Sequence, residues 1–185
     1  NDFTGLEVQP NGRLMWTPNE KNSIWLAISR AVRTPSRAEN DVLFNYGTQG
    51  KPPFLTVLQL NGSPHFNSEK LLAYEAGYRY QLAPQASIDI AAFYNDYSQL
   101  RDLTFDPRLG SFHAGIPSYF LLPIGLNNKA SGQTQGVEVS VDWQPHEKWR
   151  LQGNYSFLTM QIHSESPFRS LDPTTGSADK ITPQH

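Results

Sequence analysis

Six stretches of this sequence alternate apolar and polar side chains with a period of two, which is the pattern of β-strands. In the clearest stretch, residues 133–144, Val137, Val139 and Val141 alternate with polar side chains such as Glu138. Successive side chains of a strand point to opposite faces, so each stretch has one apolar and one polar face. The sequence therefore predicts an all-β, antiparallel meander of about six long strands. The expected strands are residues 12–17, 23–32, 71–82, 87–95, 133–144 and 149–158.

The connections between these strands alternate between short and long. Turns of a few residues near 18–22, 83–85 and 145–148 join the strands into three hairpins. Long connections rich in Pro, Gly, Ser and Asn follow, at about 33–69, about 101–131 and beyond His163. Structureless loops of this length are uncommon in compact soluble domains. Outer-membrane barrels have short turns at one rim and long loops at the other, and this pattern favours a barrel wall.

Strand length and ring placement also favour a membrane wall. No apolar run approaches the roughly 20 residues of a membrane-spanning helix, so any span must be built from strands. A strand of about 11 residues, tilted near 45°, covers roughly the 25 Å of the apolar band. Rings with one polar edge prefer the membrane interface, and two interfacial groups are expected. Near the short turns lie Trp16, Trp25, Tyr78, Tyr80, Trp143 and Trp149, and toward the other ends lie Tyr94, Tyr97, Tyr155 and Phe157.

Composition excludes several other functions. The net charge is −2 with both signs scattered, so no basic surface for nucleic acid is expected. The chain has no cysteine, and its five histidines, at 65, 113, 146, 163 and 185, are not at metal-ligand spacing. Neither a nucleophile elbow nor a Gly-rich phosphate loop is present. We therefore expect no enzyme, no metal and no cofactor.

Six strands are too few to close a membrane barrel, whose smallest single-chain forms have about eight. Two open edges would leave backbone groups unpaired in lipid, so we expect the chain to be part of a longer one. Two alternatives stay open. One is a segment of a passive outer-membrane porin, and the other is a soluble β-sandwich that binds carbohydrate.

Five segments, taken in order, resemble the C-terminal half of the TonB-dependent outer-membrane receptors. They are Trp25–Ser36 with its Arg-x-Pro ending, Ser68–Arg79, Phe93–Tyr97, Gly136–Pro145 and Trp149–Phe157. The resemblance implies a 22-stranded barrel in the bacterial outer membrane, closed by an N-terminal plug and energised through the TonB complex. It also implies uptake of a scarce ligand such as a ferric siderophore, cobalamin or a glycan. Residues 1–185 would be a partial barrel domain, in contact with lipid, without the plug and the final strands.

Candidate ligand contacts lie in the long connections. Arg33 and Arg37 could meet an anionic chelate, although Arg33 could instead end its strand in the interfacial layer and Arg37 could be solvated. Three rings, Phe112, Tyr119 and Phe120, could stack on a ligand or on the plug, or could pack the loop onto its neighbours. On the polar face, Glu75, Arg79, Glu138 and Asp142 are expected to form salt bridges to the plug or between strands.

Overall fold

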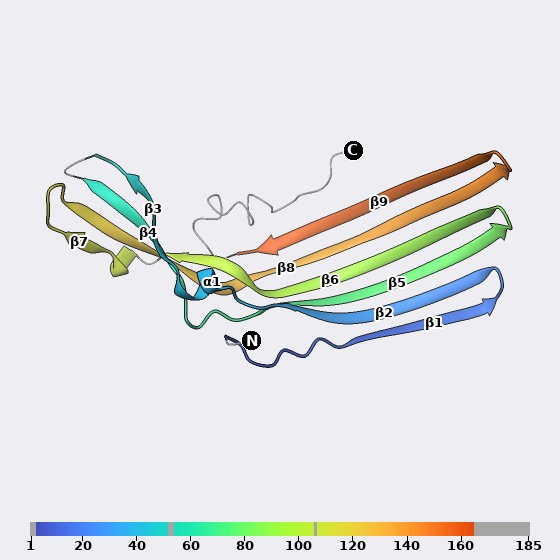
Figure 1. Cartoon of the computed structure of the whole chain (residues 1–185), viewed down its shortest axis with the longest axis horizontal. Coiled ribbons are helices and arrows are strands. Elements are labelled where there is room, and N and C mark those ends of the chain that lie inside the picture. Colours follow the sequence, from blue (N-terminus) through green and yellow to red (C-terminus); the bar gives the residue numbers. More distant parts are fainter. Residues whose placement is uncertain (1–2, 52–53, 106, 165–185) are drawn as a thin grey trace.

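The computed structural model describes residues 3–51, 54–105 and 107–164, and these form one long, curved sheet of nine strands (Figure 1). Two short helices, α1 and η1, lie in the connections. The strands are β1 (Asn11–Asn19), β2 (Asn22–Arg33), β3 (Leu43–Gln49), β4 (Leu55–Asn61), β5 (Glu69–Ala83), β6 (Ala86–Phe105), β7 (Ser111–His113), β8 (Tyr119–His146) and β9 (Trp149–His163); the helices are α1 (Arg37–Asp41) and η1 (Pro107–Leu109).

All six predicted strands are present, and together they form an antiparallel wall. In the wall, β1, β2, β5, β6, β8 and β9 pair in that order. Short turns join β1 to β2, β5 to β6 and β8 to β9, and all three turns lie at the same end of the sheet (Figure 1). The strands are longer than predicted, because β6 and β8 continue into the expected long connection between them.

The register places most of the apolar side chains of the six wall strands on one face, which we call the apolar face. One row across it runs from Leu14 through Leu26, Ala76, Ala92 and Val137 to Phe157. Many of these side chains are exposed, Leu14 by 65% and Leu26 by 51%. Within the described residues no second sheet covers this face, which does not fit the alternative of a two-sheet sandwich.

Two of the ten rings expected at the interfaces lie on the opposite, polar face, so the expectation that they stand beside the other eight is wrong. Trp25 is paired with Gly77, and Tyr97 with Gly132, both in the register of the polar face. The alternation is ambiguous at Trp25, because it stands between Ile24 and Leu26 in an unbroken apolar run. Proximity to a short turn fixes the height of a ring on the wall, but it does not fix the face.

Two of the three long connections are not structureless, which corrects the expectation for them, and the third, beyond His163, lies outside the described residues apart from Ser164. Residues 33–69 contain α1, β3 and β4, and residues 101–131 contain η1 and β7 together with parts of β6 and β8. Strand β4 runs parallel to residues 119–125 of β8, and β7 pairs with the same part of β8. We call this second part, made of β3, β4, β7 and residues 119–125, the distal sheet. It lies at the end of the molecule opposite the short turns (Figure 1).

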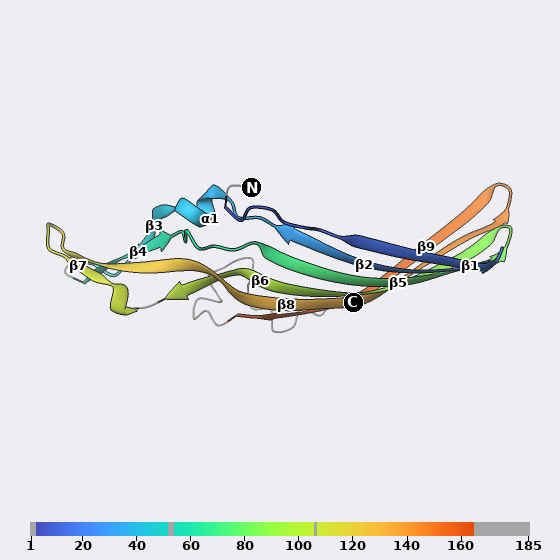
Figure 2. The ribbon, with the colours of Figure 1, turned by 90° about the horizontal axis from the view of Figure 1, so that it is seen from below.

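The connection from β2 to β5 crosses β6 and β8 on its way to the distal sheet. It starts beside β5, yet β4 pairs with β8 two strands away. Figure 2 shows α1, β3 and β4 at this end, with α1 and β3 raised to one side of β6 and β8. Most of the buried apolar residues lie around this crossing, so the core lies here and not in the wall. They are Val57, Leu58, Phe66, Ile124, Leu126 and Ala130.

Candidate functional site

The three candidate rings of the distal sheet do not share one face. Phe112 and Phe120 are direct partners across β7 and β8, and both are exposed, by 67% and 37%. Tyr119 points to the other face, because it is the neighbour of Phe120 along the strand. There its ring stacks on His113, with centroids 4.8 Å apart and planes 9° apart. A ligand on one face of the sheet can therefore contact Tyr119 or the two phenylalanines, but not all three.

The face that carries Tyr119 continues the polar face of the wall. Register irregularities lie between Tyr97 and Asp102, where β6 and β8 each gain one residue. Each extra residue shifts the alternation of its own strand by one position. When both shifts are included, the side chains of Asp102, Asn127 and Tyr119 all lie on the polar side. The same side of β3 and β4 is also polar, because it carries Gln59 and Asn45, and the Gln59 side chain donates to the Asn45 side chain at 3.2 Å. The opposite side carries Phe44, Leu60, Leu122, Phe112 and Phe120.

Arg33, the first of the two arginine candidates, is held by two carboxylates. It is the last residue of β2 and donates to Glu69, the first residue of β5, at 2.6 and 2.8 Å. It also donates to Glu39 of α1 at 2.6 and 3.1 Å. Arg101 of β6 donates its backbone N–H to the Glu69 carboxylate at 2.8 Å. Its guanidinium lies 3.8 Å from the Glu39 carboxylate. We call these four residues the charge node. Arg37, the second candidate, is the exposed first residue of α1.

Glu39 is the buried member of the charge node, with 5% of its side chain exposed. A capping box holds it, because its carboxylate accepts the Ser36 backbone N–H at 2.8 Å while the Ser36 side chain caps α1. Burial raises the pKa of Glu39, but the hydrogen bonds from Arg33 and Ser36 outweigh burial, so this pKa lies below its ordinary value. Arg33, Glu69 and Arg101 face this carboxylate. Its contribution to stability is therefore complete above the ordinary carboxyl range and is lost as the pH falls through the lowered pKa.

Two of the four charged residues expected to form salt bridges on the polar face tie neighbouring strands together. Arg79 donates to Asp89 at 2.5 Å, and Asp142 accepts from Arg150 at 2.5 Å. The other two, Glu75 and Glu138, have no ion-pair partner among the described residues. A hollow of about 530 Å³ lies on this part of the sheet, and its polar-face lining includes Trp25, Arg79, Asp89, Ala91, Glu138 and Ser140.

Trp25 shapes this hollow, and sequence analysis did not identify it as part of a site. Its indole ring lies directly against Gly77, where a Cβ atom would overlap the ring. The Arg13 guanidinium lies over the same ring, 5.2 Å from its centroid, within cation–π range. Phe93 covers Gly136 in the same way two strands away. The signal in the sequence was a glycine in a strand, which often marks the close approach of another group.

Alanine at Gly77 should therefore destabilise the wall, because its methyl group displaces the Trp25 ring. The expected cost is about 1–3 kcal/mol, as for other overpacked sites. Gly153→Ala is the matched control, since a Cβ atom there meets nothing within 4 Å. Thermal unfolding of the purified protein, followed by tryptophan fluorescence, measures both. Equal midpoints for the two variants would contradict the packing.

Within the described ranges, no group of three or more His, Asp or Glu side chains is placed to hold a metal ion. Of the five histidines, His185 lies outside these ranges, and His113 contacts Ser111 at 3.0 Å and Tyr119. In the part of the chain that the structure describes, no helix is long and apolar enough to cross a membrane.

Comparison with known proteins identifies the family. A family model described as "TonB dependent receptor-like, beta-barrel" matches residues 1–183. The chain belongs to this family of TonB-dependent receptor β-barrels. The resemblance drawn from the five sequence segments is thereby confirmed, as is the all-β barrel-wall fold. No curated protein sequence matches the chain.

Solved structures of siderophore receptors share the fold. The receptor PirA from Acinetobacter baumannii has a TM-score of 0.70 and 15% identity over 87% of this chain and 26% of its own. A mutant of the ferric enterobactin receptor PfeA from Pseudomonas aeruginosa has a TM-score of 0.71, with the same identity and coverage. Another PfeA mutant, in complex with enterobactin, has a TM-score of 0.56 and 14% identity over 90% of this chain and 34% of its own. This chain thus spans about a quarter to a third of the length of these receptors.

Proposed function

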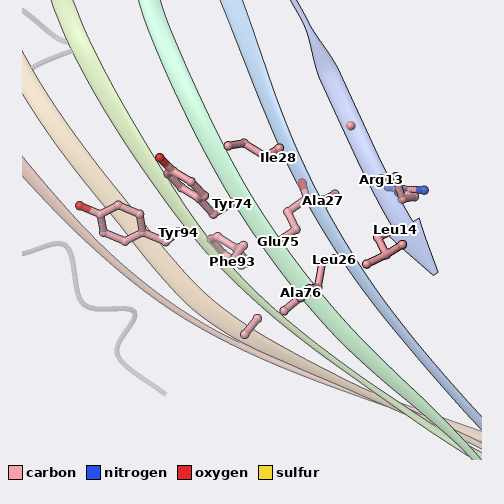
Figure 3. A pocket seen from close by; sticks show the side chains of 12 residues that line it. Arg13, Leu14, Leu26, Ala27, Ile28, Tyr74, Glu75, Ala76, Phe93 and Tyr94 are labelled. Atoms are coloured by element: carbon pink, nitrogen blue, oxygen red, sulfur yellow. The ribbon is translucent and has the colours of Figure 1, made fainter. Parts of the chain in front are cut away.

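We propose that this TonB-dependent receptor barrel segment belongs to an outer-membrane transporter that imports a scarce ligand such as a ferric siderophore. The observation that carries the proposal is the family match over residues 1–183. The wall supports a membrane location, because one face of six adjacent strands is apolar and exposed; Leu14, Leu26 and Tyr94 of this face line the pocket shown in Figure 3. A 12-residue strand such as β2, tilted near 45°, covers roughly 28 Å, enough for the apolar band. The related receptors named for siderophores favour this class of ligand.

In this proposal the apolar face of the wall contacts lipid and the polar face lines the lumen. The short turns are then periplasmic, and the distal sheet is extracellular. The open edges at β1 and β9 pair with further barrel strands of the receptor, so residues 1–185 form a partial barrel domain. Passive diffusion through an unplugged pore is the alternative mechanism for the same wall.

We place the plug of the receptor against the polar face, with the TonB complex acting through that plug. Glu75 and Glu138 support this placement, because no other described side chain pairs with their charges. Replacing both with lysine should loosen the plug by like-charge repulsion with the basic groups it would present. The expected result is a severalfold rise in entry of a large antibiotic that intact barrels exclude. Asp142→Lys is the control, since Asp142 already pairs within the wall with Arg150. An unchanged rate of antibiotic entry in the double variant would mean that Glu75 and Glu138 do not contact the plug.

Uptake by whole cells tests the transport proposal. Deleting the complete gene should abolish uptake of radiolabelled iron supplied as a ferric siderophore, and the restored gene should return it. Collapsing the proton gradient should stop uptake in the restored strain, because transport through the TonB complex depends on that gradient. Uptake that persists without the gradient would favour the passive porin. Unchanged uptake and growth after deletion, under every ligand limitation tried, would contradict the transporter.

A further inference from the structure

We propose that Arg33 is a positioning residue: it fixes the crossing of residues 33–69 and thereby sets β4 against the part of β8 that carries Tyr119. Its own hydrogen bonds argue for this role. A guanidinium has five N–H donors, and those of Arg33 make four hydrogen bonds to Glu39 and Glu69. Little donor capacity is left for an anionic ligand while both carboxylates are in place.

Both ends of the crossing segment meet at this one side chain. Glu39 follows Arg33 by six residues, and Glu69 closes the segment as the direct strand partner of Arg33. The departing and returning chains are also joined to each other. Ser63 donates its backbone N–H to the Glu39 carbonyl at 2.9 Å, and Gly62 donates to the Val42 carbonyl at 2.7 Å. The base of the segment is therefore a single unit attached to the wall through the charge node.

The two chains approach so closely at this base that Gly62 admits no side chain. A Cβ atom on Gly62 would lie 2.7 Å from the Asn40 carbonyl oxygen and 2.8 Å from the Val42 nitrogen. The hairpin of β3 and β4 starts and ends at this packed base, with Val42 before it and Gly62 after it. A change in the attachment of the base to the wall must therefore move the whole hairpin.

The hairpin in turn borders two of the candidate ligand residues, Tyr119 and Phe120. The ladder between β4 and β8 runs from Leu55 opposite Tyr119 to Asn61 opposite Gly125. Only seven residue pairs hold this parallel ladder, so its position depends on where the base is fixed. The consequence for ligand capture rests on the proposed function. The role of Arg33 in positioning β4 is independent of the proposed function, and the position of β4 can be measured without any ligand.

Hydrogen exchange of the β4 backbone amides, measured by mass spectrometry on the full receptor purified from the outer membrane in detergent, tests the proposal. Arg33→Gln should accelerate exchange across Leu55–Asn61 about tenfold, because the buried Glu39 carboxylate loses its main partner. The double variant Arg33→Gln with Glu39→Gln should exchange more slowly than the single variant, because it removes the uncompensated buried charge. Rescue of this kind identifies a charge-based attachment, which simple packing by Arg33 would not give.

Arg79→Gln is the matched control, because it removes an arginine from an ion pair near the short turns and should leave β4 unchanged. Native exchange of β4 in Arg33→Gln would overturn the proposal, as would a double variant that exchanges as fast as the single one. If Arg33→Gln does not assemble, Arg33→Lys replaces it. Lysine keeps the charge but has no planar fork, so exchange should be intermediate, and native exchange would again overturn the proposal.

Discussion

Replacing Phe157 with arginine should prevent assembly of the receptor in the outer membrane, whereas the same replacement at the adjacent Ser156 should not. Phe157 lies on the apolar face in the row of Val137 and Ala92, near the middle of the wall. An arginine at the midplane of a lipid-facing strand costs about 2–4 kcal/mol. Ser156 points to the polar face opposite Glu138, where a cation gains a partner. The two residues are neighbours in β9, so position along the chain is nearly the same for both.

The measurement is the amount of heat-modifiable, folded receptor in the outer-membrane fraction at equal synthesis. Phe157→Arg should reduce it at least about tenfold, because a strand that inserts poorly exposes the chain to envelope proteases. Ser156→Arg should stay within about twofold of the native level. Equal loss in both variants would mean that the faces of the wall do not differ in their surroundings. Loss in Ser156→Arg alone would mean that the two faces are exchanged.

The sequence was sufficient to predict the wall because its pattern is local. Each wall strand carries its own alternation, and the short turns such as 83–85 fix which strands pair. The register then aligns apolar with apolar residues in the central rows of the wall, as for Tyr78 opposite Ile90 and Ile90 opposite Val139. A slip by one residue would move an entire strand's apolar set to the wrong face, so the pattern itself specifies the register.

The distal sheet was not predicted because its pairing is not local. Strand β4 pairs with β8 in parallel across a separation of 64 residues, from Leu55 to Tyr119. Its own sequence, Leu55 to Asn61, is a short mixed run beside prolines, and β3 is broken by a bulge near Gly47. Such runs have no strong period of two. Their structure depends on the crossing of the chain, which no short window of sequence contains.

The candidate site was predicted in its residue types but not in its geometry. Arg33 was chosen as a charge at the end of a strand, and the structure places two carboxylates on it, one of them from a helix that the sequence analysis did not foresee. Phe112, Tyr119 and Phe120 were chosen as a group, and strand alternation divides them. Proximity in sequence identified the right segment, but the face of each ring follows only from the register.

Replacing Tyr119 with alanine should weaken the binding of the ferric siderophore imported under the proposed function about five- to tenfold in the full receptor, while Phe120→Ala should change it less than about twofold. Tyr119 continues the polar face, which lines the lumen in the proposed receptor, and its ring stacks on His113. An aromatic stacking contact is worth about 0.5–1.5 kcal/mol, or roughly a two- to thirteenfold change in the dissociation constant, and the expected loss lies within this range. Phe120 points away from the lumen toward Phe112.

Quenching of intrinsic fluorescence on titration with the ferric chelate measures the dissociation constants. Tyr119→Phe separates the ring from the hydroxyl group, since it should bind nearly as the native receptor does if stacking is the contact. His113→Ala should fall between the native receptor and Tyr119→Ala, because the Tyr119 ring stays but loses the neighbour that orients it. Weak binding in Phe120→Ala with native binding in Tyr119→Ala would place the ligand on the outer side of the distal sheet. That result would require the polar face to end at the register irregularities between Tyr97 and Asp102.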